Sequence, residues 1–207
     1  MKKIYFVLFL LMAYNSQSQS LFGFKGGVNI CRFTGPGVIN GASDLVAANI
    51  GVYDNTPVAK NTSIQVELSL SWEGERFDQS EESGSFKFSY LNLPVLIQQK
   101  IAGGLFAETG PQIGLLLTAT LNKTVSSPFE PSISTSGGYS DNLRTYNFSW
   151  DIGLGYKFSK MFAVDARYNI GLTNLGADQL VYKNSVLSFN VLFSPFVKHA
   201  SVKHARE

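Results

Sequence analysis

The chain has 207 residues, with 17 Lys and Arg against 15 Asp and Glu, and only 15% of its residues are charged. An ordinary soluble domain has roughly 25% charged residues, so we expect something other than water to cover part of this surface. The near balance of charge gives no basic footprint for nucleic acid. The length fits one domain, or two at most.

The first 20 residues have the build of a secretory signal peptide. Lys2 and Lys3 precede an apolar run over residues 4–14, and small polar residues follow it. The run is too short to cross a bilayer as a helix, which needs about 20 apolar residues. We therefore expect cleavage after Ser18 or Ser20, with an uncleaved N-terminal anchor as the alternative.

The sequence after residue 20 predicts strands and no helix of useful length. Most segments alternate apolar and polar residues at every second position, which is the period of a β-strand. In 147–158, for example, the apolar set is Phe148, Trp150, Ile152, Leu154, Tyr156 and Phe158. We predict eight strands, over 21–32, 45–53, 62–72, 85–99, 104–121, 145–158, 161–173 and 184–193.

The connections between these strands alternate between long and short. Two long ones, the acidic 73–84 and the Ser-, Pro- and Gly-rich 122–144, are expected to be solvated loops. The acidic segment could bind divalent cations, but a solvated hairpin tip is the simpler interpretation, and we assign no metal site. Outer-membrane barrels show this alternation, with the short turns in the periplasm, so an even strand number places both termini there.

One irregularity occurs in the predicted strand 85–99. Its apolar positions change phase after Tyr90, from Phe86 and Phe88 to Leu91 and the residues that follow at every second position, and Pro94 lies within the run. A one-residue change of phase is what a β-bulge produces, and proline is tolerated at bulges. We therefore predict a bulge near residues 90 to 94.

The two faces of the strands differ in a way that favours a membrane. The apolar face is aromatic and free of Lys and Glu, while the other face is rich in small residues that suit the crowded interior of an eight-stranded barrel. A soluble lipocalin-like barrel with the apolar face inward is the alternative, but its exterior would carry too little charge. With the apolar face outward, the inward polar residues are Lys25, Glu67, Glu108, Gln112, Asp151, Lys157, Asp165, Arg167 and Asn169.

These inward residues include both acids and bases, so they can cross-link the lumen by ion pairs and hydrogen bonds. An eight-stranded barrel leaves little room for water, which favours a plugged lumen over a charged, gated pore. The predicted architecture is an all-β, eight-stranded antiparallel up-and-down transmembrane β-barrel over 21–196. A basic tail over 197–207 follows it.

Several segments resemble the PorT-like outer-membrane β-barrel family of Bacteroidetes. The similar stretches include "FGFKGGVNICRF", "IQVELSLSWEGE", "FAETGPQIGLLL" and "FSWDIGLGYKF", and the pair "YLNLPVLI" and "DARYNIGLTNL" is the most specific. The resemblance implies one eight-stranded barrel in the outer membrane of a Gram-negative cell. Some members of that family are tied to protein secretion and gliding machinery, and most have no assigned activity.

The sequence gives little support to catalysis. Both histidines, His199 and His204, lie in the tail, so no histidine base is expected beside a barrel nucleophile. We expect a non-enzymatic barrel without a cofactor, with a structural, assembly or secretion-associated, or weakly pore-forming role; a membrane-barrel hydrolase is a less favoured alternative. The expected partners are outer-membrane lipids, the barrel-insertion machinery and secretion or surface-complex proteins.

Overall fold

The computed structural model describes residues 20–36, 38, 41–79, 82–127, 130–138, 143–176 and 182–197. Residues 1–19 of the predicted signal peptide (1–20) and residues 198–207 of the predicted tail (197–207) lie outside these ranges. Among the described residues, no helix combines the length and hydropathy that a membrane span requires.

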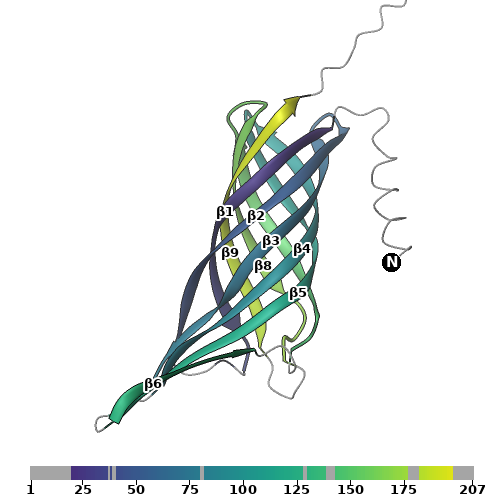
Figure 1. The fold of residues 1–207 in the computed structure, drawn as a ribbon. Coiled ribbons are helices and arrows are strands. Elements are labelled where there is room, and N and C mark those ends of the chain that lie inside the picture. Colours follow the sequence, from purple (N-terminus) through teal and green to yellow (C-terminus); the bar gives the residue numbers. More distant parts are fainter. Residues whose placement is uncertain are drawn as a thin grey trace, which may run out of the picture.

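Nine strands form one antiparallel sheet in the described part of the chain, and eight of them close into a ring (Figure 1). The strands are β1 (Leu21–Thr34), β2 (Ala42–Ala59), β3 (Thr62–Asp78), β4 (Glu82–Ala102), β5 (Leu105–Ser127), β6 (Glu130–Gly138), β7 (Tyr146–Lys157), β8 (Phe162–Gly171) and β9 (Lys183–Val197). The ring runs β1, β2, β3, β4, β5, β7, β8, β9, and β9 pairs with β1 to close it. β6 pairs with the far part of β5 and lies outside the ring.

The two ends of the ring differ. Residues 60–61, 103–104 and 158–161 make tight connections at the end where β1 begins and β9 finishes, and we call this the turn end. Gly103 has a φ of 54° in one of these turns, a left-handed conformation that glycine adopts without steric cost. At the opposite end, the loop end, the β3–β4 and β5–β6 hairpins extend beyond the ring (Figure 1).

The alternation predicted from sequence is confirmed most clearly in β7. From Tyr146 to Tyr156 every second side chain is exposed, and the residues between them are buried. Ile152 is 52% exposed on the outside, whereas Asp151 beside it is 0% exposed. The same outward apolar face continues around the ring in β1 to β5, β8 and β9, so a broad apolar belt surrounds a polar interior.

The two segments expected to be solvated loops are largely strand. Residues 73–78 belong to β3 and pair with the start of β4, as in Phe77 opposite Gly84. Residues 122–127 continue β5, and β6 lies within the segment predicted as the longest loop. The polar composition suggested solvated loops. Outside the apolar belt, however, the backbone N–H and C=O groups of a polar segment can pair in a hairpin as well as with water.

The bulge predicted near residues 90 to 94 is not in β4, which keeps its phase from Phe88 to Gln98. A register shift does occur between Ser89 and Tyr90, but the extra residue is Leu117 on the partner strand β5. The change of apolar phase in the sequence has a different cause, because Phe88 and Tyr90 point inward while Leu91 and the next apolar residues face outward.

Phe88 and Tyr90 belong to a buried apolar cluster that we call the aromatic cap. Its members are Phe33, Phe88, Tyr90, Ala119 and Leu175. Phe33 and Phe88 stack with their ring centroids 5.5 Å apart. The cap draws on β1, β4, β5 and the connection after β8, all near the loop end. It therefore covers the polar interior from that end.

The facing of β7 predicts opposite results at two neighbouring positions. In a Cys31→Ala background, which removes the single native cysteine, Ile152→Cys should react with an apolar, bilayer-partitioning maleimide, because its side chain lies on the outer belt. Ser149→Cys, with 2% exposure, should react only after unfolding. Labelling in lipid vesicles checks this, and equal reactivity of the two cysteines in the folded state would contradict the facing.

Candidate functional site

The barrel interior has three levels. An open vestibule of about 840 Å³ lies at the turn end, bounded by residues such as Tyr53, Gln98 and Phe106. A dense polar network fills the middle of the lumen, where the remaining cavity is about 30 Å³. The aromatic cap closes the loop end. The middle level contains most of the polar residues predicted from sequence, and we take it as the candidate site.

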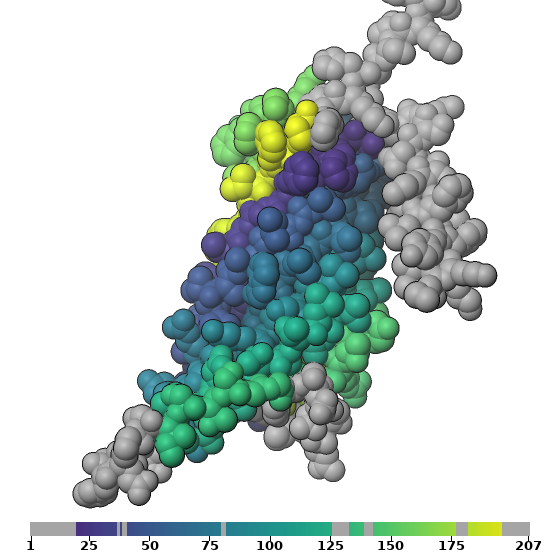
Figure 2. Space-filling model, in the orientation of Figure 1, coloured from purple at the N-terminus to yellow at the C-terminus, as the bar shows by residue number. Residues whose placement is uncertain are grey.

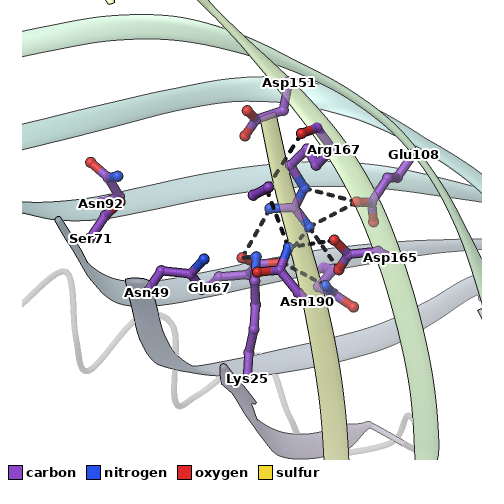
Figure 3. A network of polar contacts seen from close by, with 12 residues as sticks. Lys25, Asn49, Glu67, Ser71, Asn92, Glu108, Asp151, Asp165, Arg167 and Asn190 are labelled. Atoms are coloured by element: carbon purple, nitrogen blue, oxygen red, sulfur yellow. Dashed lines mark hydrogen bonds and ion pairs between the residues drawn. The ribbon is translucent and has the colours of Figure 1, made fainter. Parts of the chain in front are cut away.

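Arg167 on β8 is the centre of the network (Figure 3). Its Nη1 and Nη2 donate to Glu67 Oε2 at 3.1 Å and Oε1 at 2.9 Å, and its Nε donates to Glu108 Oε1 at 2.8 Å. Lys25 Nζ donates to Glu67 Oε2 at 2.8 Å. Asp165 Oδ2 lies 3.6 Å from Arg167 Nη2. One guanidinium is thus shared among three carboxylates.

The pair between Arg167 and Glu67 spans the width of the barrel. β3, which carries Glu67, and β8 are separated by three strands on either side of the ring, so they lie opposite each other. The contact is bidentate, the strongest geometry for arginine and a carboxylate. Both side chains are almost fully buried, at 4% and 0% exposure, so little water screens the attraction.

Side-chain amides donate to a carboxylate oxygen of each acid in the network. Gln65 Nε2 donates to Glu67 Oε1 at 2.7 Å, and Gln98 Nε2 donates to Glu108 Oε2 at 2.9 Å. Asn190 Nδ2 donates to Asp165 Oδ1 at 2.6 Å. A buried ion pair is favourable only when such additional hydrogen bonds compensate for lost hydration. These amides supply that compensation.

The structure divides the predicted inward residues into groups. Lys25, Glu67, Glu108, Asp165 and Arg167 meet in the ion-pair network described above. Asp151 and Asn169 form a second group, in which Asn169 Nδ2 donates to Asp151 Oδ1 at 2.7 Å. Gln112 is half-buried and lines the small cavity beside them.

Lys157 was predicted to belong with these residues, but it lies apart from them at the vestibule. Its Nζ is 5.3 Å from the centroid of the Phe106 ring, and the residue as a whole is exposed. The register of β7 explains this position, because Lys157 is its last residue and lies at the turn end. Gly155 makes room for the same ring, since a Cβ there would lie 2.2 Å from Phe106 Cζ.

The vestibule is electrostatically different from the middle of the lumen. Among the described residues that line it there is no Asp or Glu. Its basic residues are Lys60, Lys100, Lys157 and Lys160. The positive mouth and the acid-rich middle are therefore neighbouring compartments of one lumen.

Sequence reasoning missed Glu73 and Glu75, which lie inside the barrel with 4% and 2% exposure. Glu73 accepts hydrogen bonds from Ser71 Oγ at 2.7 Å, from Asn92 Nδ2 at 3.1 Å and from Asn184 Nδ2. The signal was present, because the inward phase of β3 at Glu67 and Ser71 continues at both glutamates. The acidic composition of 73–84 concealed it.

The described residues do not bring three or more His, Cys, Asp or Glu side chains together as a metal-binding group. Both histidines fall outside the described ranges. What the mid-lumen arrangement can do is hold charge and cross-link opposite walls.

A closed ring of eight antiparallel strands, apolar outside and polar inside, defines the class of transmembrane β-barrels. The sequence over residues 15–176 matches the family described as outer membrane protein beta-barrel domain, and the chain belongs to that family. No curated protein matches the chain.

Solved structures of small outer-membrane proteins share this fold. Neisserial surface protein A (NspA) is 9% identical, with a TM-score of 0.50, and the match covers 84% of this chain and 96% of that one. Ail of Yersinia pestis is 14% identical, with a TM-score of 0.45 and coverage of 86% and 99%. CarO of Acinetobacter baumannii is 11% identical, with a TM-score of 0.45 and coverage of 82% and 96%. At these identities the likeness concerns the fold alone.

Removing the central cation should be costly. Arg167→Met leaves Glu67 and Glu108 without their main partner in a buried site, so the free energy of unfolding should fall by about 3–5 kcal/mol. The matched control is Arg32→Met, which breaks the exposed pair with Asp44 and should cost at most about 1 kcal/mol. Urea unfolding in lipid vesicles, followed by tryptophan fluorescence, measures both. Equal losses in the two variants would contradict the central role of Arg167.

Proposed function

We propose that this chain is a non-enzymatic outer-membrane scaffold with a closed lumen, which presents its loop-end hairpins at the cell surface. The observation that carries this proposal is the ion-pair network across the barrel. Arg167 joins opposite walls through Glu67, and the space left at that level is about 30 Å³. A cavity of that size holds only a water or two, which supports a lumen that is closed to larger solutes at this level.

The orientation in the membrane follows from the two ends. Outer-membrane barrels have short turns in the periplasm and longer segments outside. The connections at 60–61, 103–104 and 158–161 are tight, so the turn end, with both ends of the barrel chain, is assigned to the periplasm. A cleaved signal peptide over residues 1–20 would provide export to that compartment.

The extended hairpins support an assembly role. The far parts of β3, β4, β5 and β6 continue the sheet beyond the ring, and the β5–β6 hairpin projects from the body of the molecule (Figure 2). A paired, projecting sheet is a defined surface for another protein. The resemblance to PorT-like barrels of Bacteroidetes supports secretion or surface-complex proteins as partners, besides the surrounding lipids and the barrel-insertion machinery.

The two alternatives fare differently. A soluble lipocalin-like barrel requires its apolar face inside, and the outward belt with Trp150 and Ile152 exposed contradicts it. A membrane-barrel hydrolase would need a base beside a nucleophile, and the central acids Glu67 and Glu108 are instead engaged with amides and with Arg167. A deletion strain with normal lipid A and surface-protein profiles would agree with a non-enzymatic role.

Location gives the first test of the proposal. After expression of the full chain, the mature protein should fractionate with the outer membrane and migrate differently on gels before and after heating, because folded barrels resist detergent unfolding. Protein recovered in soluble form from the periplasm would contradict the proposal.

Conductance gives the second test. Purified wild-type protein in planar bilayers should show no steady single-channel current, because the network closes the lumen. Arg167→Ala should produce a leak or a lower unfolding temperature, and Arg32→Ala, which alters an exposed pair, should stay silent. A wide and stable conductance in the wild type would overturn the closed lumen.

A further inference from the structure

The charges buried in this barrel do not balance. Among the described residues, the fully buried cations are Lys25 and Arg167. The fully buried carboxylates are Glu67, Glu73, Glu75, Glu108, Asp151 and Asp165. Ionised carboxylates in a poorly hydrated interior are costly unless a positive partner neutralises them. Some of these acids therefore need a counter-charge that the side chains do not supply.

The two cations serve only one part of the lumen. Lys25 and Arg167 make their ion pairs with Glu67, Glu108 and Asp165. The hydrogen bonds to Glu73 and Asp151 come from hydroxyl and amide groups, which are neutral. Glu75, the remaining buried carboxylate, accepts a hydrogen bond from the backbone N–H of Phe33 at 2.7 Å. Glu73, Glu75 and Asp151 are therefore the buried carboxylates that have no ion pair with Lys25 or Arg167, and Glu73 and Asp151 are the two that line the same cavity.

The small mid-lumen cavity lies between these two acids. Glu73 and Asp151 both line it, and its volume of about 30 Å³ has room for a small ion or for a water or two. Lys25 and Arg167 also line it, but both are already engaged by Glu67. We call this cavity the acidic chamber.

Two oxygen atoms at the acidic chamber lack a partner among the described residues. Asp151 Oδ2 accepts no hydrogen bond, although its residue is 0% exposed. Asn49 Oδ1 is also unpaired, and its orientation is fixed because its Nδ2 donates to Asn29 Oδ1 at 2.8 Å. Both residues line the chamber. Asp165 Oδ2, Asn184 Oδ1 and Asn190 Oδ1 also accept no hydrogen bond from the described residues, but these residues do not line the cavity. Two unsatisfied acceptors on the wall of one cavity favour a positively charged or donating occupant there.

We propose that the acidic chamber binds one hard cation through oxygen atoms. Asp151 supplies the free carboxylate oxygen and is the principal ligand. Asn49 contributes a further unpaired oxygen to the lining, and Glu73, whose oxygens accept hydrogen bonds from Ser71, Asn92 and Asn184, contributes negative charge. Hard cations such as Na⁺ and Ca²⁺ prefer these ligands, whereas transition metals prefer nitrogen and sulfur donors, which the chamber lacks. A bound water could satisfy both unpaired oxygens, but it would leave the excess negative charge in place. A cation does both.

The size of the chamber limits the choice of ion. Mg²⁺ gives up its water reluctantly and demands near-ideal octahedral geometry, so it fits a small cavity with one free carboxylate oxygen less well. Na⁺ and Ca²⁺ tolerate irregular oxygen cages, so both are included as separate arms of the test.

The test compares unfolding temperatures of the full mature protein in detergent at constant ionic strength. Replacing choline chloride by NaCl or CaCl₂ should raise the wild-type midpoint by about 5 °C at saturating cation, because an ion bound to the folded state alone stabilises that state. Asp151→Asn should abolish the rise, because it removes the free carboxylate while keeping the size of the side chain. Retention of radioactive sodium or calcium by the folded protein, lost in Asp151→Asn, gives a readout that does not depend on stability.

Controls separate this site from general effects of charge. Asp165→Asn changes another buried carboxylate that does not line the acidic chamber, so it should keep the cation response. Glu73→Gln serves as a second chamber variant if Asp151→Asn fails to fold, and it should weaken the response. The proposal is overturned if the wild-type midpoint is the same in choline, sodium and calcium salts. It is also overturned if only lower pH raises the midpoint, since a proton would then be the counter-charge.

Discussion

A single guanidinium joins opposite walls of this barrel. Arg167 reaches Glu67 on β3 and Glu108 on β5 from β8, and Lys25 on β1 adds a second cation at Glu67. The backbone ladder sets the mean diameter of a barrel through strand number and stagger, but it makes no bond between opposite walls. The network supplies such bonds, and its low-dielectric surroundings make them strong. The closed middle of the lumen, and the separation of the vestibule from the cap, depend on it.

Chemistry changes along the barrel axis. The vestibule at the turn end carries lysines such as Lys100 and Lys157 and no carboxylate among its described lining residues, the middle is rich in acids, and the loop end is covered by Phe33, Phe88 and their neighbours. The three levels therefore offer different surroundings: positive charge at the mouth, ion pairs and hydrogen bonds in the middle, and aromatic packing at the loop end.

The sequence predicted the strands and their facing well, because the two-residue period is a property of each strand alone. Ile152 outward and Asp151 inward could be read without knowing any partner. The inward glutamates Glu73 and Glu75 were missed, since local acidity suggested solvent while the phase of β3 continued inward. The same limit applies to Phe88, because period two does not reveal which aromatic residues face the lumen. For Glu73 and Glu75, the two-residue phase of β3 was the better guide to facing than the acidic composition of the segment.

The contacts across the lumen could not be predicted from local patterns. That Arg167 meets Glu67 depends on ring size and on the register of every strand between them, which short-range sequence does not specify. Lys157 illustrates the point, because its inward phase was evident but its height along the axis was not.

The closing seam between β1 and β9 sets the order in which the molecule can be assembled. Leu21 lies opposite Val197 and Thr34 opposite Lys183, so the first strand of the barrel finds its second neighbour only in the last. Until that strand arrives, β1 keeps an open edge with unpaired backbone groups, which a hydrocarbon environment penalises heavily. The whole barrel sequence, through β9, must therefore be present before the ring can close. Until then the unpaired backbone groups of the β1 edge need another partner.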